Sequence, residues 1–132
     1  MQHVINVLEP IFQEHCCRVK SAPEESLTIF KLRAHGHGVP DEVTKQLTSF
    51  YLQVAEVPCL DSFAVHGCDE IIIFEWWQDG ELWLGTKDYY ILRWSSEKAR
   101  FCIGDANNVS FSNEEEFIMF SDAVVALANV YS

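Results

Sequence analysis

Residues 71–94 read IIIFEWWQDGELWLGTKDYYILRW, and this stretch decides the fold because its side chains follow the period of a β-strand. The first seven residues, Ile71–Trp77, begin apolar on both faces, which predicts a central strand covered on both sides. Asp79-Gly80 then predicts a two-residue hairpin turn. This register sets three cross-strand pairs: Trp77 with Leu82, Trp76 with Trp83, and Glu75 with Leu84.

Further strands are predicted on both sides of this hairpin, at Ser62–Val65, Tyr89–Trp94, Arg100–Ile103 and Val109–Phe111. Ser112 and Glu115 have the spacing of a capping box, and acids at 114–116 suit the first turn of a helix. A final helix is therefore expected. Its core face is expected to contain Phe117, Phe120, Val124, Leu127 and Tyr131.

Before residue 60 the apolar period is that of a helix. A first helix is expected over residues 3–19, where Pro10 predicts either a kink or a new helix beginning near Glu9. A second helix is expected from Ser21 until the glycines at 36 and 38, although residues 27–32 also tolerate a strand. A third begins at Val39-Pro40-Asp41 and has one apolar stripe, formed by Val43, Leu47, Phe50 and Val54.

The order of these elements predicts a single α+β domain over residues 1–132. It consists of a mostly antiparallel meander flanked by N-terminal helices and one C-terminal helix. With 48% apolar residues, the chain of 132 residues is long enough to bury a core.

The charge of the chain narrows the classes of partner. Nine Lys and Arg face twenty Asp and Glu, a formal net charge of −11. Residues 1–60 hold five bases and seven acids, or −2, and the remainder holds four bases and thirteen acids, or −9. Nucleic acids and anionic membranes both attract basic surfaces, so neither is expected as a partner. A basic protein is favoured instead.

Cysteine usage indicates the compartment. The five cysteines at 16, 17, 59, 68 and 102 contain no C-x-x-C motif, and the first residues do not have the pattern of a secretory signal. The longest apolar run is too short to span a bilayer. We therefore expect free thiols in a reducing cytoplasm.

Few motifs suggest catalysis, and no cofactor is expected. The sequence contains neither a phosphate-binding loop nor the G-x-S-x-G motif of a nucleophilic serine. The alternative is a small metal-dependent or Cys/His enzyme that uses His35, His37, His66 and Cys68, residue types that bind zinc.

Aromatic and acidic residues are interleaved over residues 74–94, which include every tryptophan. Tryptophan is enriched where proteins bind one another, and an acidic rim suits a basic ligand. The alternative is a sheet core with a solvated acidic edge. The predicted partner-binding residues are Glu75, Trp76, Trp77, Asp79, Glu81, Trp83 and Asp88.

Residues 22–131 resemble the SUKH superfamily, which includes fungal cell-wall regulators and bacterial toxin-immunity proteins. The similar motifs are Gly38-Val-Pro-Asp-Glu42, Leu47-Thr-Ser-Phe-Tyr51, Trp83-Leu-Gly85, Phe101-Cys-Ile-Gly-Asp105 and Ser121–Leu127. In this chain Val54-Ala-Glu-Val-Pro58 stands where the family usually has Asn-Gly.

The resemblance implies an α+β fold and a non-enzymatic protein that binds and neutralises a toxin, often a nuclease. The acidic charge agrees with such a partner independently, because nucleases have basic substrate clefts. A monomer or weak homodimer is expected. A regulatory scaffold that binds an endogenous partner is a further alternative.

Overall fold

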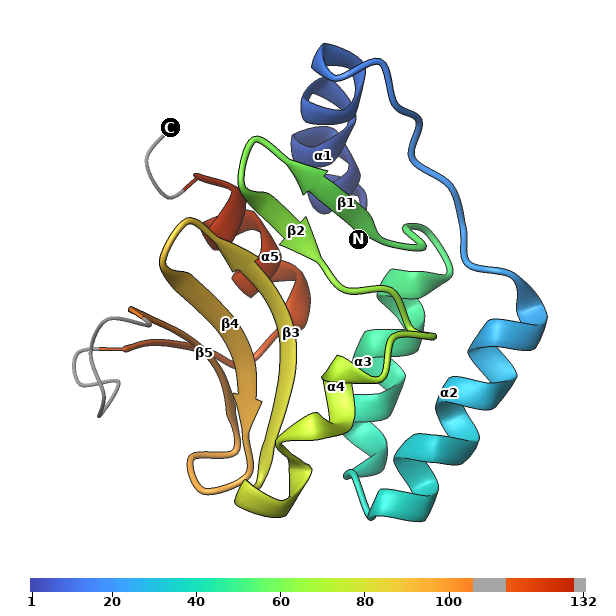
Figure 1. The fold of residues 1–132 in the computed structure, drawn as a ribbon, viewed down its shortest axis with the longest axis vertical. Helices are drawn as coiled ribbons and strands as arrows, with labels where there is room; N and C mark the ends of the chain where they lie inside the picture. The colour runs from blue at the N-terminus through green and yellow to red at the C-terminus, as the bar shows by residue number, and fades with distance from the viewer. Residues whose placement is uncertain (106–113, 130–132) are drawn as a thin grey trace.

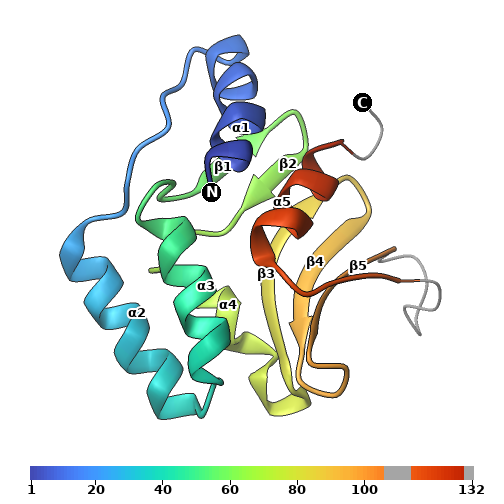
Figure 2. The same ribbon diagram turned by 180° about the vertical axis from the view of Figure 1, so that it is seen from behind.

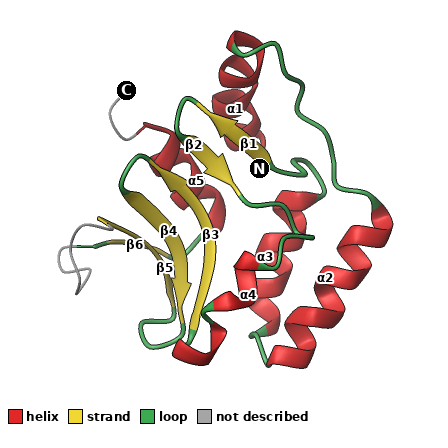
Figure 3. Ribbon diagram, viewed as in Figure 1, coloured by secondary structure: helices red, strands yellow, loops and turns green. Residues whose placement is uncertain are grey.

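A six-stranded antiparallel sheet organises the chain in the computed structural model, which describes residues 1–105 and 114–129. Within these residues the strands follow one another across the sheet in chain order, as expected of a meander (Figures 1 and 3). Three helices precede the sheet and one follows it. The α+β prediction is therefore confirmed. The predicted strand at Val109–Phe111, the capping residue Ser112 and the core residue Tyr131 lie outside the described residues.

The first helix, α1 (Gln2–Glu14), buries Val4, Leu8 and Phe12 on one face. Pro10 lies inside this continuous helix. Of the two alternatives, a new helix beginning near Glu9 is therefore not observed. The helix is shorter than predicted because Cys16 takes a left-handed backbone with φ of 58°. That conformation ends the helix before the stripe can extend to Val19.

The second and third helices form a pair, α2 (Glu24–His37) and α3 (Asp41–Tyr51). Residues 27–32 are therefore helical rather than a strand. Gly38 ends α2 with φ of 82°, a conformation that glycine adopts without steric cost. The predicted stripe is buried: Val43, Leu47 and Phe50 on α3, and Val54 just beyond it.

The strands are β1 (Val57–Leu60), β2 (Phe63–Val65), β3 (Glu81–Lys87), β4 (Tyr90–Ser95), β5 (Arg100–Asp105) and β6 (Glu115–Phe117). Alternate side chains of the central strands enter the core, among them Leu82, Leu84, Leu92, Trp94, Phe101 and Ile103. The last helix, α5 (Phe120–Asn129), packs against β3 and β4 and lies in front of them in the view of Figure 2. Phe120, Val124 and Leu127 are fully buried on it, as predicted.

The predicted strand at residues 71–77 is wrong. These residues form the short helix α4 (Ile72–Glu75), followed by the 3-10 turn η1 (Trp77–Asp79). Strand β3 already pairs with β2 and β4, so no free edge is left for another strand. Gly80 closes η1 with φ of 77°, and Asp79-Gly80 is therefore no hairpin turn. The three predicted pairs, Trp77 with Leu82, Trp76 with Trp83 and Glu75 with Leu84, do not exist as cross-strand pairs.

The predicted helix start at residues 114–116 is also wrong. Residues 115–117 form β6, where Phe117 pairs with Phe101 and Glu116 with Cys102. The helix begins at Phe120, three residues after the last residue of β6. Pairing with β5 and ionic contacts of Glu114 outweigh the helix-start signal of three consecutive acids.

Candidate functional site

Two stacked tryptophans form a partly exposed aromatic surface at one end of the sheet. Trp76, at the junction of α4 and η1, stacks on Trp83 of β3 with ring centroids 5.1 Å apart and planes 25° from parallel. Trp76 is 40% exposed, although a tryptophan usually buries most of its surface. Trp83 follows the core residue Leu82 and so projects from the opposite face of the sheet. We call this pair the Trp76–Trp83 stack.

Acidic side chains accompany the stack. Glu75 and Asp79 are exposed on either side of Trp76 in the chain. Glu81 is half-buried and accepts a hydrogen bond from the indole Nε1 of Trp83 at 3.2 Å. The predicted combination of aromatic rings and carboxylates is thus assembled here, although by a helical turn rather than a hairpin.

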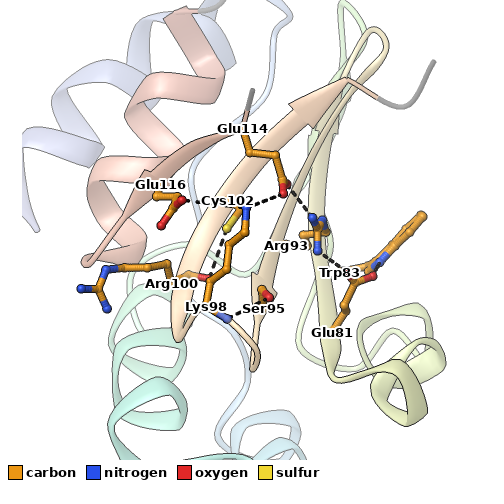
Figure 4. A network of polar contacts seen from close by, with 9 residues as sticks. All are labelled: Glu81, Trp83, Arg93, Ser95, Lys98, Arg100, Cys102, Glu114 and Glu116. Atoms are coloured by element: carbon orange, nitrogen blue, oxygen red, sulfur yellow. Dashed lines mark hydrogen bonds and ion pairs between the residues drawn. The ribbon is translucent and has the colours of Figure 1, made fainter. Parts of the chain in front are cut away.

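Arg93 of β4 organises the polar network beside the stack (Figure 4). Its guanidinium group pairs with Glu81, and its Nη2 donates to Glu114 Oε2 at 2.6 Å. The side chains of Arg93 and Glu114 are only 5% and 2% exposed. Two carboxylates on one buried guanidinium satisfy its charge, which a lone buried arginine could not do.

Lys98 extends this network toward solvent. Its Nζ lies 3.1 Å from Glu114 and 3.8 Å from Glu116. The hydrogen bond that the amine of Lys98 donates to Glu114 raises the pKa of Lys98, so this amine stays charged. Glu81 and Glu114 are therefore already paired with basic side chains of the same chain. Glu75 and Asp79, the other acids beside the stack, form no ion pair with any described residue.

Two predicted site residues lie elsewhere. Trp77 turns inward, stacks on Trp94 with centroids 6.2 Å apart, and donates from Nε1 to the carbonyl of His37 at 2.6 Å. Asp88 lies in the turn after β3, at the end of that strand opposite Glu81, where its N–H donates to Ser62. The structure therefore groups Glu75, Trp76, Asp79, Glu81 and Trp83 and separates Trp77 and Asp88 from them.

An apolar groove of about 490 Å³ lies on the other side of Trp77. Trp77 and Trp94 form part of its wall, and Ile118 and Met119, 67% and 45% exposed, form another part. Sequence reasoning missed Arg93, Glu114, Ile118 and Met119. A single arginine within the apolar run of β4 was the available signal for Arg93.

Three buried groups hold their protons firmly. Burial raises the pKa of Cys102 to about 11, and nearby Glu114 adds to the effect. Burial, followed by the carboxylate of Asp69, also raises the pKa of Cys68. The pKa of Tyr51 is raised well above its ordinary value, and burial is the main cause. The hydroxyl of Tyr51 donates to the carbonyl of His66 at 2.7 Å. A neutral thiol is a poor nucleophile, and the thiols of Cys68 and Cys102 are also buried.

The four residues of the enzyme alternative do not form a metal-binding group among the described residues. His37 stacks on Phe74 with centroids 4.8 Å apart, and His66 lies 3.7 Å from Glu70. Across residues 1–105 and 114–129, no three histidine, cysteine or carboxylate side chains come together as a metal site would require. His35 is exposed, whereas Cys68 is buried.

Comparison with known protein families, with curated proteins and with solved structures finds no match. The SUKH resemblance therefore stays a prediction from the sequence motifs. None of the helices in the described part of the chain has the length and apolar character needed to cross a membrane.

Proposed function

We propose that this protein is a non-enzymatic binding protein that caps a basic domain of another protein. In the most specific form of the proposal it is a SUKH-type immunity protein, and the partner is a toxin domain, with nucleases as the favoured class. The observation that carries the proposal is the Trp76–Trp83 stack, an aromatic surface with Trp76 40% exposed, next to the carboxylates of Glu75 and Asp79, which form no ion pair among the described residues.

The stack has the properties of a binding hot spot. Tryptophans dominate the binding energy of many interfaces because they bury a large rigid surface at low entropic cost. Trp83 holds Trp76 in a fixed orientation, and Glu81 fixes Trp83 through its indole N–H. A partner would then bury the exposed face of Trp76 without first ordering it.

Charge supports a basic partner. The chain carries −11, of which −9 lies after residue 60, by the same count of thirteen acids and four bases. Glu75 and Asp79 are exposed beside Trp76 and would face the basic residues in the substrate cleft of the partner. Long-range attraction of this kind accelerates association and weakens as salt rises.

Titration of the chain against a panel of basic toxin domains, nucleases among them, tests the proposal. Trp76→Ala should weaken the complex about 30-fold, as expected when an interface tryptophan is removed. Tyr89→Ala is the matched control, because Tyr89 is 64% exposed in the turn at the far end of β3 and should leave affinity unchanged. Equal affinities of both variants would contradict the proposed surface.

A charge pair of variants tests the electrostatic part. Glu75→Gln with Asp79→Asn should lower the association rate and flatten its salt dependence, with a smaller effect on dissociation. Glu24→Gln with Glu25→Gln removes the same charge from the first turn of α2 and serves as the control. Failure of the wild-type chain to bind or inhibit any basic toxin domain would instead contradict the function itself.

A further inference from the structure

The segment between α1 and α2 places two thiols and two cations around one hollow. Cys16, Cys17, Arg18 and Lys20 line a cavity of about 430 Å³, whose opposite wall includes Ala55 and Pro58. Small-molecule sites in proteins occupy roughly 300–1,000 Å³. Both thiols are free, and Cys16 is exposed while Cys17 is half-buried.

Backbone contacts hold this wall in place. The N–H groups of Cys16 and Cys17 donate to the carbonyls of Gln13 and Phe12 at 3.0 and 2.8 Å, which closes the end of α1. Farther along, the carbonyl of Lys20 accepts a hydrogen bond from Ala55 at 2.5 Å. The segment that carries the thiols and cations is thus hydrogen-bonded at both of its ends, to α1 and to Ala55, and is not a free linker.

The chemistry of the hollow favours an anion with a reactive sulfur. Arg18 and Lys20 are two of only nine basic residues in the chain, and Glu56 is the one acid that lines the same cavity. Thiols that are accessible and next to cations are the ones that undergo exchange. The Sγ of Cys17 also donates weakly to the carbonyl of His15 at 3.4 Å, which fixes its direction.

We propose that this hollow is a thiol-modification site that takes an anionic low-molecular-weight disulfide of the glutathione class. The thiolate of Cys16 or Cys17 attacks one sulfur of the disulfide, and a protein–ligand S–S bond forms. The S–S bond of the ligand breaks, and the departing thiolate takes a proton. The cysteine sulfur is oxidised and the departing sulfur reduced, so the ligand is itself the oxidant. The site lies apart from the Trp76–Trp83 stack and does not depend on the function proposed above.

The first experiment compares cysteines within one molecule. The reduced full chain is incubated with oxidised glutathione, and the adducts are located by peptide mass mapping over time. Cys16 or Cys17 should be modified several times faster than Cys59. Cys59 is also exposed, on β1, but it does not line the hollow. Modification of Cys59 at an equal or higher rate would overturn the proposal.

The second experiment separates anion recognition from simple exposure of the thiols. Arg18→Gln with Lys20→Gln should slow the reaction with oxidised glutathione by about threefold to tenfold, the effect of removing two exposed charges. The reaction with the neutral hydroxyethyl disulfide should keep its rate. Lys31→Gln with Arg33→Gln removes two exposed cations from α2 and controls for net charge.

Each outcome of this comparison decides the proposal. Loss of rate only with the anionic disulfide, and only in the Arg18 and Lys20 variant, supports it. An equal loss of reaction rate in both charge variants would mean that only net charge matters, and it would overturn the proposal. An equal loss of rate with both disulfides would also overturn the proposal. All four substituted side chains are exposed, so these variants should fold.

Discussion

Trp76 and Trp77 are adjacent in the chain and have opposite roles. Trp77 is held inside by Trp94 and by the carbonyl of His37, whereas Trp76 is 40% exposed and rests on Trp83. The junction between α4 and η1 turns the backbone between them. A substitution at Trp77 therefore tests stability, and a substitution at Trp76 tests binding.

At the same scale, Cys102 makes folding sensitive to alkaline pH. The folded state raises the pKa of this thiol from an ordinary 9.0 to about 11, so folding holds the proton more tightly than the unfolded chain does. Its contribution to stability is therefore complete below about pH 9 and falls as pH rises toward about 11. A pKa difference of this size corresponds to roughly 2–3 kcal/mol at most.

The test is urea unfolding of wild type and Cys102→Ala between pH 8 and about pH 11. Cys102→Ala should be less stable at pH 8, because it leaves a small cavity, but its free energy of unfolding should fall less steeply above about pH 9. Tyr51 and Cys68 titrate in the same direction and leave a residual slope in both proteins. Parallel curves for the two proteins would contradict the assignment to Cys102.

Among the elements, β6 is the one most dependent on ionic contacts. It has three residues, and Glu114 just before it is tied to Arg93 of β4 across the intervening strand β5. Arg93→Ala should cost about 3–5 kcal/mol because it leaves the buried carboxylate of Glu114 with only the partly exposed Lys98 as its ionic partner. Lys98→Ala is the matched control. Lys98 binds the same carboxylate but is 39% exposed, so its loss should cost less than about 1 kcal/mol.

Urea unfolding of both variants, in a cycle with Glu114→Gln, measures the coupling. We expect Glu114→Gln to offset part of the loss in Arg93→Ala, since it removes a buried charge that Lys98 alone compensates only in part. Additive effects of the two substitutions would mean that the contact does not hold β6.

The long amphipathic helices were predictable from the sequence, and the short apolar segment before β3 was not. The helical stripes of Val4, Leu8 and Phe12 and of Val43, Leu47 and Phe50 were found because each extends over more than two turns. The run Ile71–Trp77 was misassigned because a short apolar segment fits a strand or a buried helix equally well. Packing of Phe74 against Phe30 and His37 decides between them, and no local pattern reveals that contact.

The candidate site was predictable in composition but not in arrangement. Glu75, Trp76, Asp79, Glu81 and Trp83 were identified because aromatic and acidic residues are concentrated in one stretch. The inward turn of Trp77 depends on the misassigned helix. The partners of Arg93 lie 12 and 21 residues away in the chain, so the pairing exists only after the sheet has formed.

Over the whole molecule, the two proposed sites are separated in space and in charge. The segment between α1 and α2, which contains Arg18 and Lys20, runs along the upper right of Figure 1, and the turn between α4 and β3, which contains η1, lies at the bottom of the same view. Residues 1–60 carry −2 and the remainder −9. The field of the molecule should therefore orient a basic partner toward the sheet before contact occurs.

The two outermost strands of the meander, β1 and β6, bear on how the chain avoids polymerising. An unpaired strand edge can act as a template on which further chains assemble. Here the first edge contains Pro58, which has no N–H to offer, and the second spans three residues and exposes Glu115 and Glu116. Pro58→Thr combined with Glu116→Thr should restore a regular, less charged edge and increase light scattering at high concentration, while Glu9→Thr on α1 should not. Unchanged scattering in the double variant would mean that the sheet margins do not govern the solubility of the folded chain.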